Sequence, residues 1–199
     1  MHKELASPLR SLAASEAAIS PWLRNTGIVV FGSAFVAACS HLSIPLWFTP
    51  VPLTMQPFAV LLLALILTPG LATATLCAYL MEGALGLPVF APGFGFSAGM
   101  AHLLGPTGGY LWSYPVAAAL ASSLFRSSSR GFVAAIAGAA LGNLVILFSG
   151  FVWIAAYAHA SSGTAFTLAV LPFLPGDALK VIAVASIATG FRRVRHRKA

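Results

Sequence analysis

The chain has 199 residues, of which 59% are hydrophobic and 8% are charged. Water-soluble domains have about 25% charged residues, so this composition excludes a soluble protein and predicts an integral membrane protein. The net charge of +7 does not indicate nucleic acid as a partner, because the basic residues are confined to both tails and one short loop, without interleaved aromatic residues or a recognition motif.

The chain divides into one membrane domain with a tail at each end. Residues 1–20 are predicted to form a polar cytoplasmic N-terminal tail rather than a signal peptide, because no small-residue cleavage pattern follows the apolar run. Residues 21–191 are predicted to form the membrane domain, and residues 192–199 a basic cytoplasmic C-terminal tail. This length leaves no room for a separate soluble domain.

Six apolar segments within the membrane domain are predicted to be helices. They cover approximately residues 22–44, 54–67, 71–85, 110–125, 131–158 and 176–191, separated by irregular loops rich in Pro, Gly and Ser. The second segment is the weakest, because it is shorter than the roughly 20 residues that cross a bilayer. In the fifth, Gly138-xxx-Gly142 is interpreted as a helix-packing motif. The predicted fold is an all-α integral membrane protein, a compact bundle of six transmembrane helices.

The basic residues set the orientation of this bundle. Ten of the 11 lie at or before the start of the first segment, between the fourth and fifth segments, or after the sixth. With six crossings all ten fall on one side, which the positive-inside rule assigns to the cytoplasm. The sequence therefore predicts a multi-pass protein of the plasma (cytoplasmic) membrane with both termini cytoplasmic.

An acid and a base lie three residues apart at the start of the sixth segment. Three residues correspond to about 300° of helical rotation, so Asp177 and Lys180 project from nearly the same side. An ionised side chain inside a membrane costs about 2.5–3.5 kcal/mol, and such pairs usually line binding pockets or ion paths. Two alternatives stay open, namely that Asp177 caps the helix start and that Lys180 extends its ammonium to the headgroup layer.

Further polar residues are expected at the same outer end of the bundle. Glu82, near the end of the third segment, is either a snorkelling or capping carboxylate or a pocket residue. The sequence predicts an outward-facing pocket, roofed by Phe90, Phe94 and Phe96, with a polar lining of Gln56, Tyr79, Glu82, Asp177 and Lys180. His102 is interpreted as interfacial or packed. No metal site is expected, because no His or Cys cluster is present.

Four stretches, in this order, resemble the BioY family, the biotin-binding membrane component of energy-coupling-factor (ECF) vitamin transporters. They are VPLTMQPFAVLLLAL (51–65), YLMEGALGLPVFA (79–91), LLGPTGGYL (103–111) and PFLPGDALK (172–180). The resemblance implies a six-helix substrate-binding (S) component that binds biotin near the outer face and needs no cofactor.

The resemblance also implies roles for individual residues. Asp177 and Lys180 are expected to be polar ligands of biotin, with Gln56 and Tyr79 at the border of the pocket. Aromatic side chains, such as those of Phe90 and Tyr110, are expected to pack on the ring system. The small-residue pair Ala34 and Ala38 is expected to contact the transmembrane coupling protein that works with the ATPase subunits.

The predicted function is biotin capture for ATP-driven uptake, without enzymatic activity. The expected partners are biotin, the lipid bilayer, the coupling protein and its ATPases, with homo-oligomerisation left open. One alternative is a solitary biotin transporter that works without the ATPase module. Another is an intramembrane enzyme with Glu82 or Asp177 as acid or base, which lacks a second convergent catalytic group.

Overall fold

The computed structural model describes residues 20–92 and 99–197, with side chains described up to Phe191. Residues 1–19 of the predicted N-terminal tail, the side chains of the predicted C-terminal tail, and Phe94 and Phe96 of the predicted roof lie outside this part. In chain order the elements are α2 (Pro21–His41), β1 (Ser43–Ile44), β2 (Leu53–Thr54), α3 (Gln56–Ile66), α4 (Pro69–Ala84), α5 (Met100–Leu103), α6 (Gly108–Ser127), α7 (Phe132–Tyr157), α8 (Ser162–Ala169) and α9 (Leu174–Arg197).

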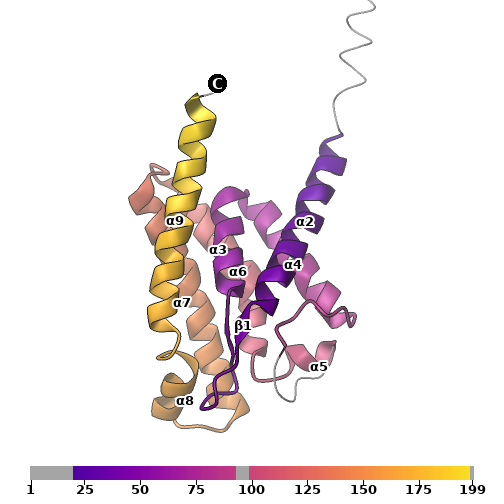
Figure 1. Cartoon of the computed structure of the whole chain (residues 1–199), viewed down its shortest axis with the longest axis vertical. Coiled ribbons are helices and arrows are strands. Elements are labelled where there is room, and N and C mark those ends of the chain that lie inside the picture. The colour runs from indigo at the N-terminus through magenta and orange to yellow at the C-terminus, as the bar shows by residue number, and fades with distance from the viewer. Residues whose placement is uncertain (1–19, 93–98, 198–199) are drawn as a thin grey trace, which may run out of the picture.

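The architecture is a helical bundle, which confirms the all-α class. The six predicted apolar segments fall on α2, α3, α4, α6, α7 and α9. In Figure 1, α2 begins and α9 ends at the same end of the bundle, whereas α5, α8 and β1 lie at the opposite end. Among the described residues, three helical stretches are long and apolar enough to cross a membrane: Pro21–His41, Phe132–Tyr157 and Leu174–Phe191.

Short elements occur where the sequence predicts irregular loops. Strands β1 and β2 form an antiparallel pair in which Ser43 lies opposite Thr54 and Ile44 opposite Leu53. Backbone groups at the end of a bundle need hydrogen-bond partners, and this ladder supplies some of them. It stays at two residues per strand because the intervening loop contains Pro45, a residue without an N–H donor.

The sides of the bundle expose large apolar side chains. Phe31 on α2, Val133 on α7 and Leu179 on α9 have exposed fractions of 80%, 81% and 71%. A water-soluble monomer rarely exposes large contiguous apolar surface, whereas a bilayer favours it. The surface therefore agrees with the membrane protein predicted from composition.

The short helix α3 ends against an arginine of α6. Arg126 Nη2 donates to the carbonyl of Ile66 at 3.1 Å, and Arg126 Nε donates to the carbonyl of Leu67 at 3.2 Å. Ser122 donates to the same Leu67 carbonyl at 2.9 Å. The last carbonyls of a helix have no partner within it, so these donors allow α3 to end inside the bundle after 11 residues.

Glycines on α7 allow three helices to approach closely. A Cβ on Gly138 would lie 2.8 Å from the carbonyl oxygen of Ala121 on α6. A Cβ on Gly142 would lie 2.7 Å from Cδ2 of Leu61 on α3. These contacts confirm the interpretation of Gly138-xxx-Gly142 as a packing motif, as expected for small residues between membrane helices.

Gly138→Ala is predicted to destabilise the bundle, because the new methyl group would press on the backbone of α6. Overpacking of this kind costs about 1–3 kcal/mol. Thermal unfolding in detergent measures the effect, with Gly27→Ala as the matched control, since a Cβ on Gly27 has nothing within 4 Å. Equal unfolding midpoints for the two variants would contradict the packing role of Gly138.

Candidate functional site

A buried salt bridge joins Asp177 and Lys180 on α9. Lys180 Nζ donates to Asp177 Oδ1 at 2.9 Å, and Lys180 and Asp177 are 9% and 3% exposed. Pro175 is tolerated in the first turn of α9, because the backbone N–H that proline lacks would have no partner within the helix there. Asp177 lies in the same turn, where the helix dipole favours a carboxylate. Lys180 thus points into the protein rather than toward the headgroup layer.

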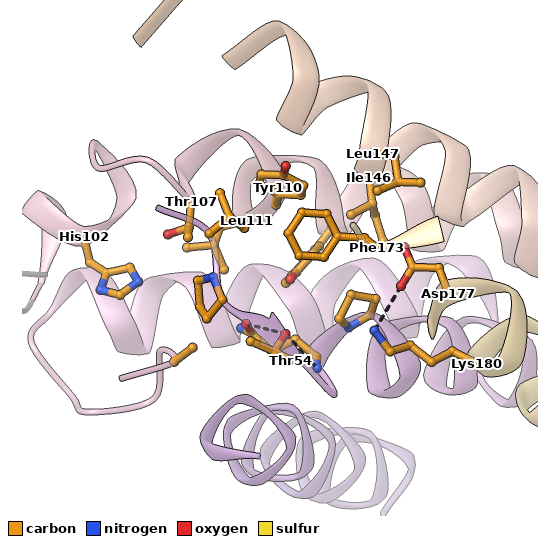
Figure 2. A pocket seen from close by; sticks show the side chains of 16 residues that line it. Thr54, His102, Thr107, Tyr110, Leu111, Ile146, Leu147, Phe173, Asp177 and Lys180 are labelled. Carbon is orange, nitrogen blue, oxygen red and sulfur yellow. Dashed lines mark hydrogen bonds and ion pairs between the residues drawn. The ribbon is translucent and has the colours of Figure 1, made fainter. Parts of the chain in front are cut away.

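The ion pair lines a cavity between α3, α6, α7 and α9 (Figure 2). The cavity has a volume of about 40 Å³. Its lining is largely apolar with a few polar groups, as is usual for small-molecule sites. The lining residues are Val51, Pro52, Thr54, Gln56, Pro57, Ala91, His102, Thr107, Tyr110, Leu111, Tyr114, Ile146, Leu147, Phe173, Asp177 and Lys180.

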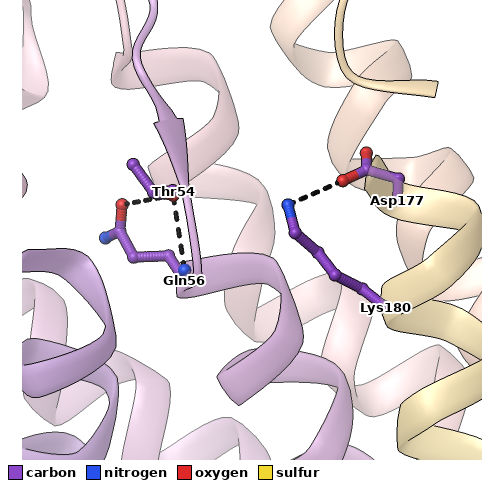
Figure 3. A network of polar contacts seen from close by, with 4 residues as sticks. All are labelled: Thr54, Gln56, Asp177 and Lys180. Carbon is purple, nitrogen blue, oxygen red and sulfur yellow. Dashed lines mark hydrogen bonds and ion pairs between the residues drawn. The ribbon is translucent and has the colours of Figure 1, made fainter. Parts of the chain in front are cut away.

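Gln56, the first residue of α3, belongs to this lining and is held by its neighbours. Its Nε2 donates to the hydroxyl of Tyr79 at 2.6 Å, and that hydroxyl donates to the carbonyl of Val89 at 2.9 Å. Thr54 Oγ1 accepts from the backbone N–H of Gln56 at 3.3 Å. Figure 3 shows Lys180 extending from α9 toward the start of α3, so that the ion pair faces Thr54 and Gln56. Tyr79 lies behind Gln56 and is not part of the lining.

Tyr110 of α6 is the fourth predicted residue that lines the cavity, after Asp177, Lys180 and Gln56. Its hydroxyl donates to the carbonyl of Ala169 at 2.7 Å, which ties α6 to the end of α8. Its ring packs against Phe173 in an edge-on arrangement, with ring centroids 6.3 Å apart. Gly150 of α7 leaves the space that this ring occupies, since a Cβ there would overlap it.

Phe90 supports the cavity from outside its lining. It is 8% exposed, and its ring packs edge-on against Tyr79 with centroids 5.5 Å apart. It also contacts the ring of His102, which does line the cavity, with centroids 4.9 Å apart. A Cβ on Gly83 of α4 would overlap the Phe90 ring, so this position requires glycine.

Three predicted functional residues lie elsewhere in the fold. Glu82 of α4 does not line the cavity and instead accepts a hydrogen bond from Ser33 of α2 at 2.8 Å. Ala34 and Ala38 lie on the exposed face of α2, where a partner can reach them. The structure therefore brings together Gln56, Tyr110, Asp177 and Lys180 in the lining, with Tyr79 and Phe90 behind it.

Several residues of the lining were not predicted from the sequence. Thr54, Thr107 and Phe173 lie inside the family-like stretches, so a signal for them was present. His102 was interpreted as interfacial or packed, and it is 5% exposed and part of the lining. Leu111 also lies inside the stretch 103–111, whereas no sequence signal distinguishes Tyr114, Ile146 and Leu147 from ordinary apolar helix positions.

Comparison with known proteins identifies the family. A model of the BioY family matches residues 9–197. Among similar proteins, the probable biotin transporter BioY of Pyrococcus horikoshii is 42% identical, over 70% of this chain and 79% of its own. The biotin transporter BioY of Thermotoga maritima is 32% identical, over 81% of this chain and 92% of its own.

A solved structure matches the fold. It is the S-component for biotin from an ECF-type ABC transporter, with a TM-score of 0.78 and 26% sequence identity, over 88% of this chain and 95% of that one. The match between the family model and nearly the whole chain agrees with the four stretches noted in the sequence. The chain belongs to the BioY family.

Proposed function

We propose that this chain is the biotin-binding S component of an ECF-type transporter. The observation that carries the proposal is the Asp177–Lys180 pair, buried in the wall of a mostly apolar cavity. The names of the relatives and of the matching solved structure support biotin as the ligand.

The chemistry of biotin suits this cavity. Its ureido group offers two N–H donors beside a carbonyl acceptor, and the rest of the ring system is an apolar thioether ring. Asp177 accepts from a ureido N–H, while Lys180, with three donors of which one is used by Asp177, donates to the ligand. Tyr110 and Phe173 supply aromatic surface for the ring system.

Binding also requires the cavity to widen. Its volume of about 40 Å³ is far below the roughly 300–1,000 Å³ of typical ligand pockets. Biotin must therefore push lining side chains apart, and the long side chain of Lys180 has the rotatable bonds to make room. The Gln56–Tyr79 and Tyr110–Ala169 hydrogen bonds hold the remaining wall in place.

The membrane placement belongs to the same proposal. The helices α2, α3, α4, α6, α7 and α9 form the bundle within the plasma membrane, with the start of α2 and the end of α9 in the cytoplasm. Their common position at one end of the bundle and the basic residues near that end support this orientation (Figure 1). The cavity then lies toward the outer half, and the α2 face with Ala34 and Ala38 contacts the coupling protein.

Asp177→Asn is predicted to weaken biotin binding by about 10- to 100-fold, because a hydrogen bond to a charged group contributes roughly 1.5–3 kcal/mol. Calorimetric titration of the detergent-purified protein measures this. Ser186→Ala is the matched control, since its hydroxyl bonds to the Ile182 carbonyl of the same helix, away from the cavity. An Asp177→Asn protein that remains folded and binds biotin with unchanged affinity would remove Asp177 from the site.

Ala38→Leu is predicted to abolish uptake driven by the coupling protein and ATPases while leaving biotin affinity unchanged, because the larger side chain prevents close helix contact. Ala137→Leu, at an exposed alanine of α7, is the control. Radiolabelled biotin uptake in cells without other biotin transport measures the effect. Full uptake by the Ala38→Leu protein would contradict the docking role, and uptake in the absence of the coupling proteins would indicate a solitary transporter.

A further inference from the structure

A groove with a volume of about 790 Å³ runs along the side of the bundle between α6 and α7. It is separate from the biotin cavity, because none of the described residues that line one of them also lines the other. The large side chains of its wall are Trp112 and Val116 on α6, and Leu144, Phe148, Val152 and Trp153 on α7.

The groove extends over about one leaflet of a bilayer. On α7 its wall includes a residue at every fourth position from Leu144 to Ala156, which places these side chains in one row along the helix. This row rises by about 18 Å, close to the roughly 15 Å that half of a hydrocarbon core measures. Trp112 near the start of α6 and Trp153 near the end of α7 lie at the same end of the groove, as expected for tryptophans at a membrane interface.

The polar groups in the wall of the groove already have partners. Ser149 donates to the carbonyl of Gly109 at 2.8 Å, and Ser113 donates to the carbonyl of Tyr110 at 2.7 Å. The two indole N–H groups also donate to backbone carbonyls. No ionisable side chain lies among the described residues of the wall. The groove therefore offers its occupant an apolar surface, which suits a hydrocarbon chain.

The size of the wall residues favours lipid over a second protein as the occupant. Membrane helices associate through small residues, which let their backbones approach closely. The groove instead exposes Phe148, Leu144 and Val116, with exposed fractions of 69%, 63% and 55%. It is also continuous with the apolar sides of the bundle, which face the bilayer. A flexible acyl chain can follow this uneven surface, whereas a rigid helix cannot lie close to it.

The groove and the biotin cavity share one short segment, residues 102–107, as part of their surroundings. Trp112 Nε1 donates to the carbonyl of Leu103 at 3.1 Å, and Trp153 Nε1 donates to the carbonyl of Gly105 at 2.8 Å. Both ends of this segment line the cavity. An occupant that packs on the two indole rings therefore restricts the motion of a segment that forms part of the cavity wall.

We propose that the groove between α6 and α7 binds one acyl chain of a phospholipid, and that this chain fixes the two tryptophans that hold segment 102–107. With the membrane orientation given under the proposed function, the lipid belongs to the outer leaflet. The lipid site goes beyond biotin capture, and it can be measured without biotin.

Quenching of tryptophan fluorescence tests the site in detergent-purified protein, with added phosphatidylcholine that has brominated acyl chains. Trp22→Phe and Trp47→Phe remove the two tryptophans outside the groove, so that the remaining emission comes from Trp112 and Trp153. We expect the quenching to follow a saturation curve for one site. Quenching that increases without saturation would overturn the proposal, because it would reflect lipid contact all around the bundle.

A substitution that fills the groove provides the second part of this experiment. Val152→Phe is expected to raise the lipid concentration at half-maximal quenching by about tenfold, because the larger side chain occupies the space of the acyl chain. Val133→Phe, at an exposed valine of the same helix outside the groove, is the matched control. Equal curves for the two variants would overturn the site. A dimer that Val152→Phe dissociates, without saturable quenching, would show instead that the groove binds a second copy of the chain.

Hydrogen exchange tests the link to the cavity wall. Phosphatidylcholine is expected to slow the exchange of backbone N–H groups in segment 102–107 of the unchanged chain, but not in Val152→Phe. Saturable quenching together with unchanged exchange in this segment would refute the link between the groove and the cavity wall.

Discussion

The structure depends most on a lysine ammonium and an aspartate carboxylate that meet 2.9 Å apart inside an apolar bundle. Burying such a pair is costly, and well-packed apolar residues in its place are often as stable or more stable. Removing one partner, however, costs about 3–5 kcal/mol, because a buried charge is left without compensation. Stability alone therefore does not explain why the chain buries this pair, whereas a ligand that contacts both Asp177 and Lys180 does.

The rest of the fold holds the surroundings of this pair in position. Tyr79 fixes the amide of Gln56, and Tyr110 ties α6 to the end of α8. Trp153 holds the loop before α6. The first of these hydrogen bonds joins the consecutive helices α3 and α4, whereas the other two join residues 59 and 48 positions apart in the sequence. The cavity wall is therefore assembled from several elements of the bundle. Glycines at positions 83 and 150 provide the space for the aromatic rings of the wall.

Much of this organisation follows from the sequence, because a bilayer leaves few options for an apolar chain. The apolar segments and the Pro- and Gly-rich loops predicted the long helices, and the spacing of Asp177 and Lys180 predicted that they share a face. The lining residues Ile146 and Leu147 could not be predicted, since their position depends on how α7 is rotated against its neighbours. Thr107 lies inside a family-like stretch, but a threonine before a helix normally caps it, and only the structure shows that its hydroxyl makes no capping bond.

A crystal structure of the chain with biotin bound tests most directly whether the Asp177–Lys180 pair binds biotin. We expect the ureido ring between α3 and α9, with a ureido N–H within hydrogen-bond distance of Asp177, and with the ureido carbonyl accepting from Lys180. Biotin bound outside this cavity, or inside it without contact to either charged group, would contradict the account.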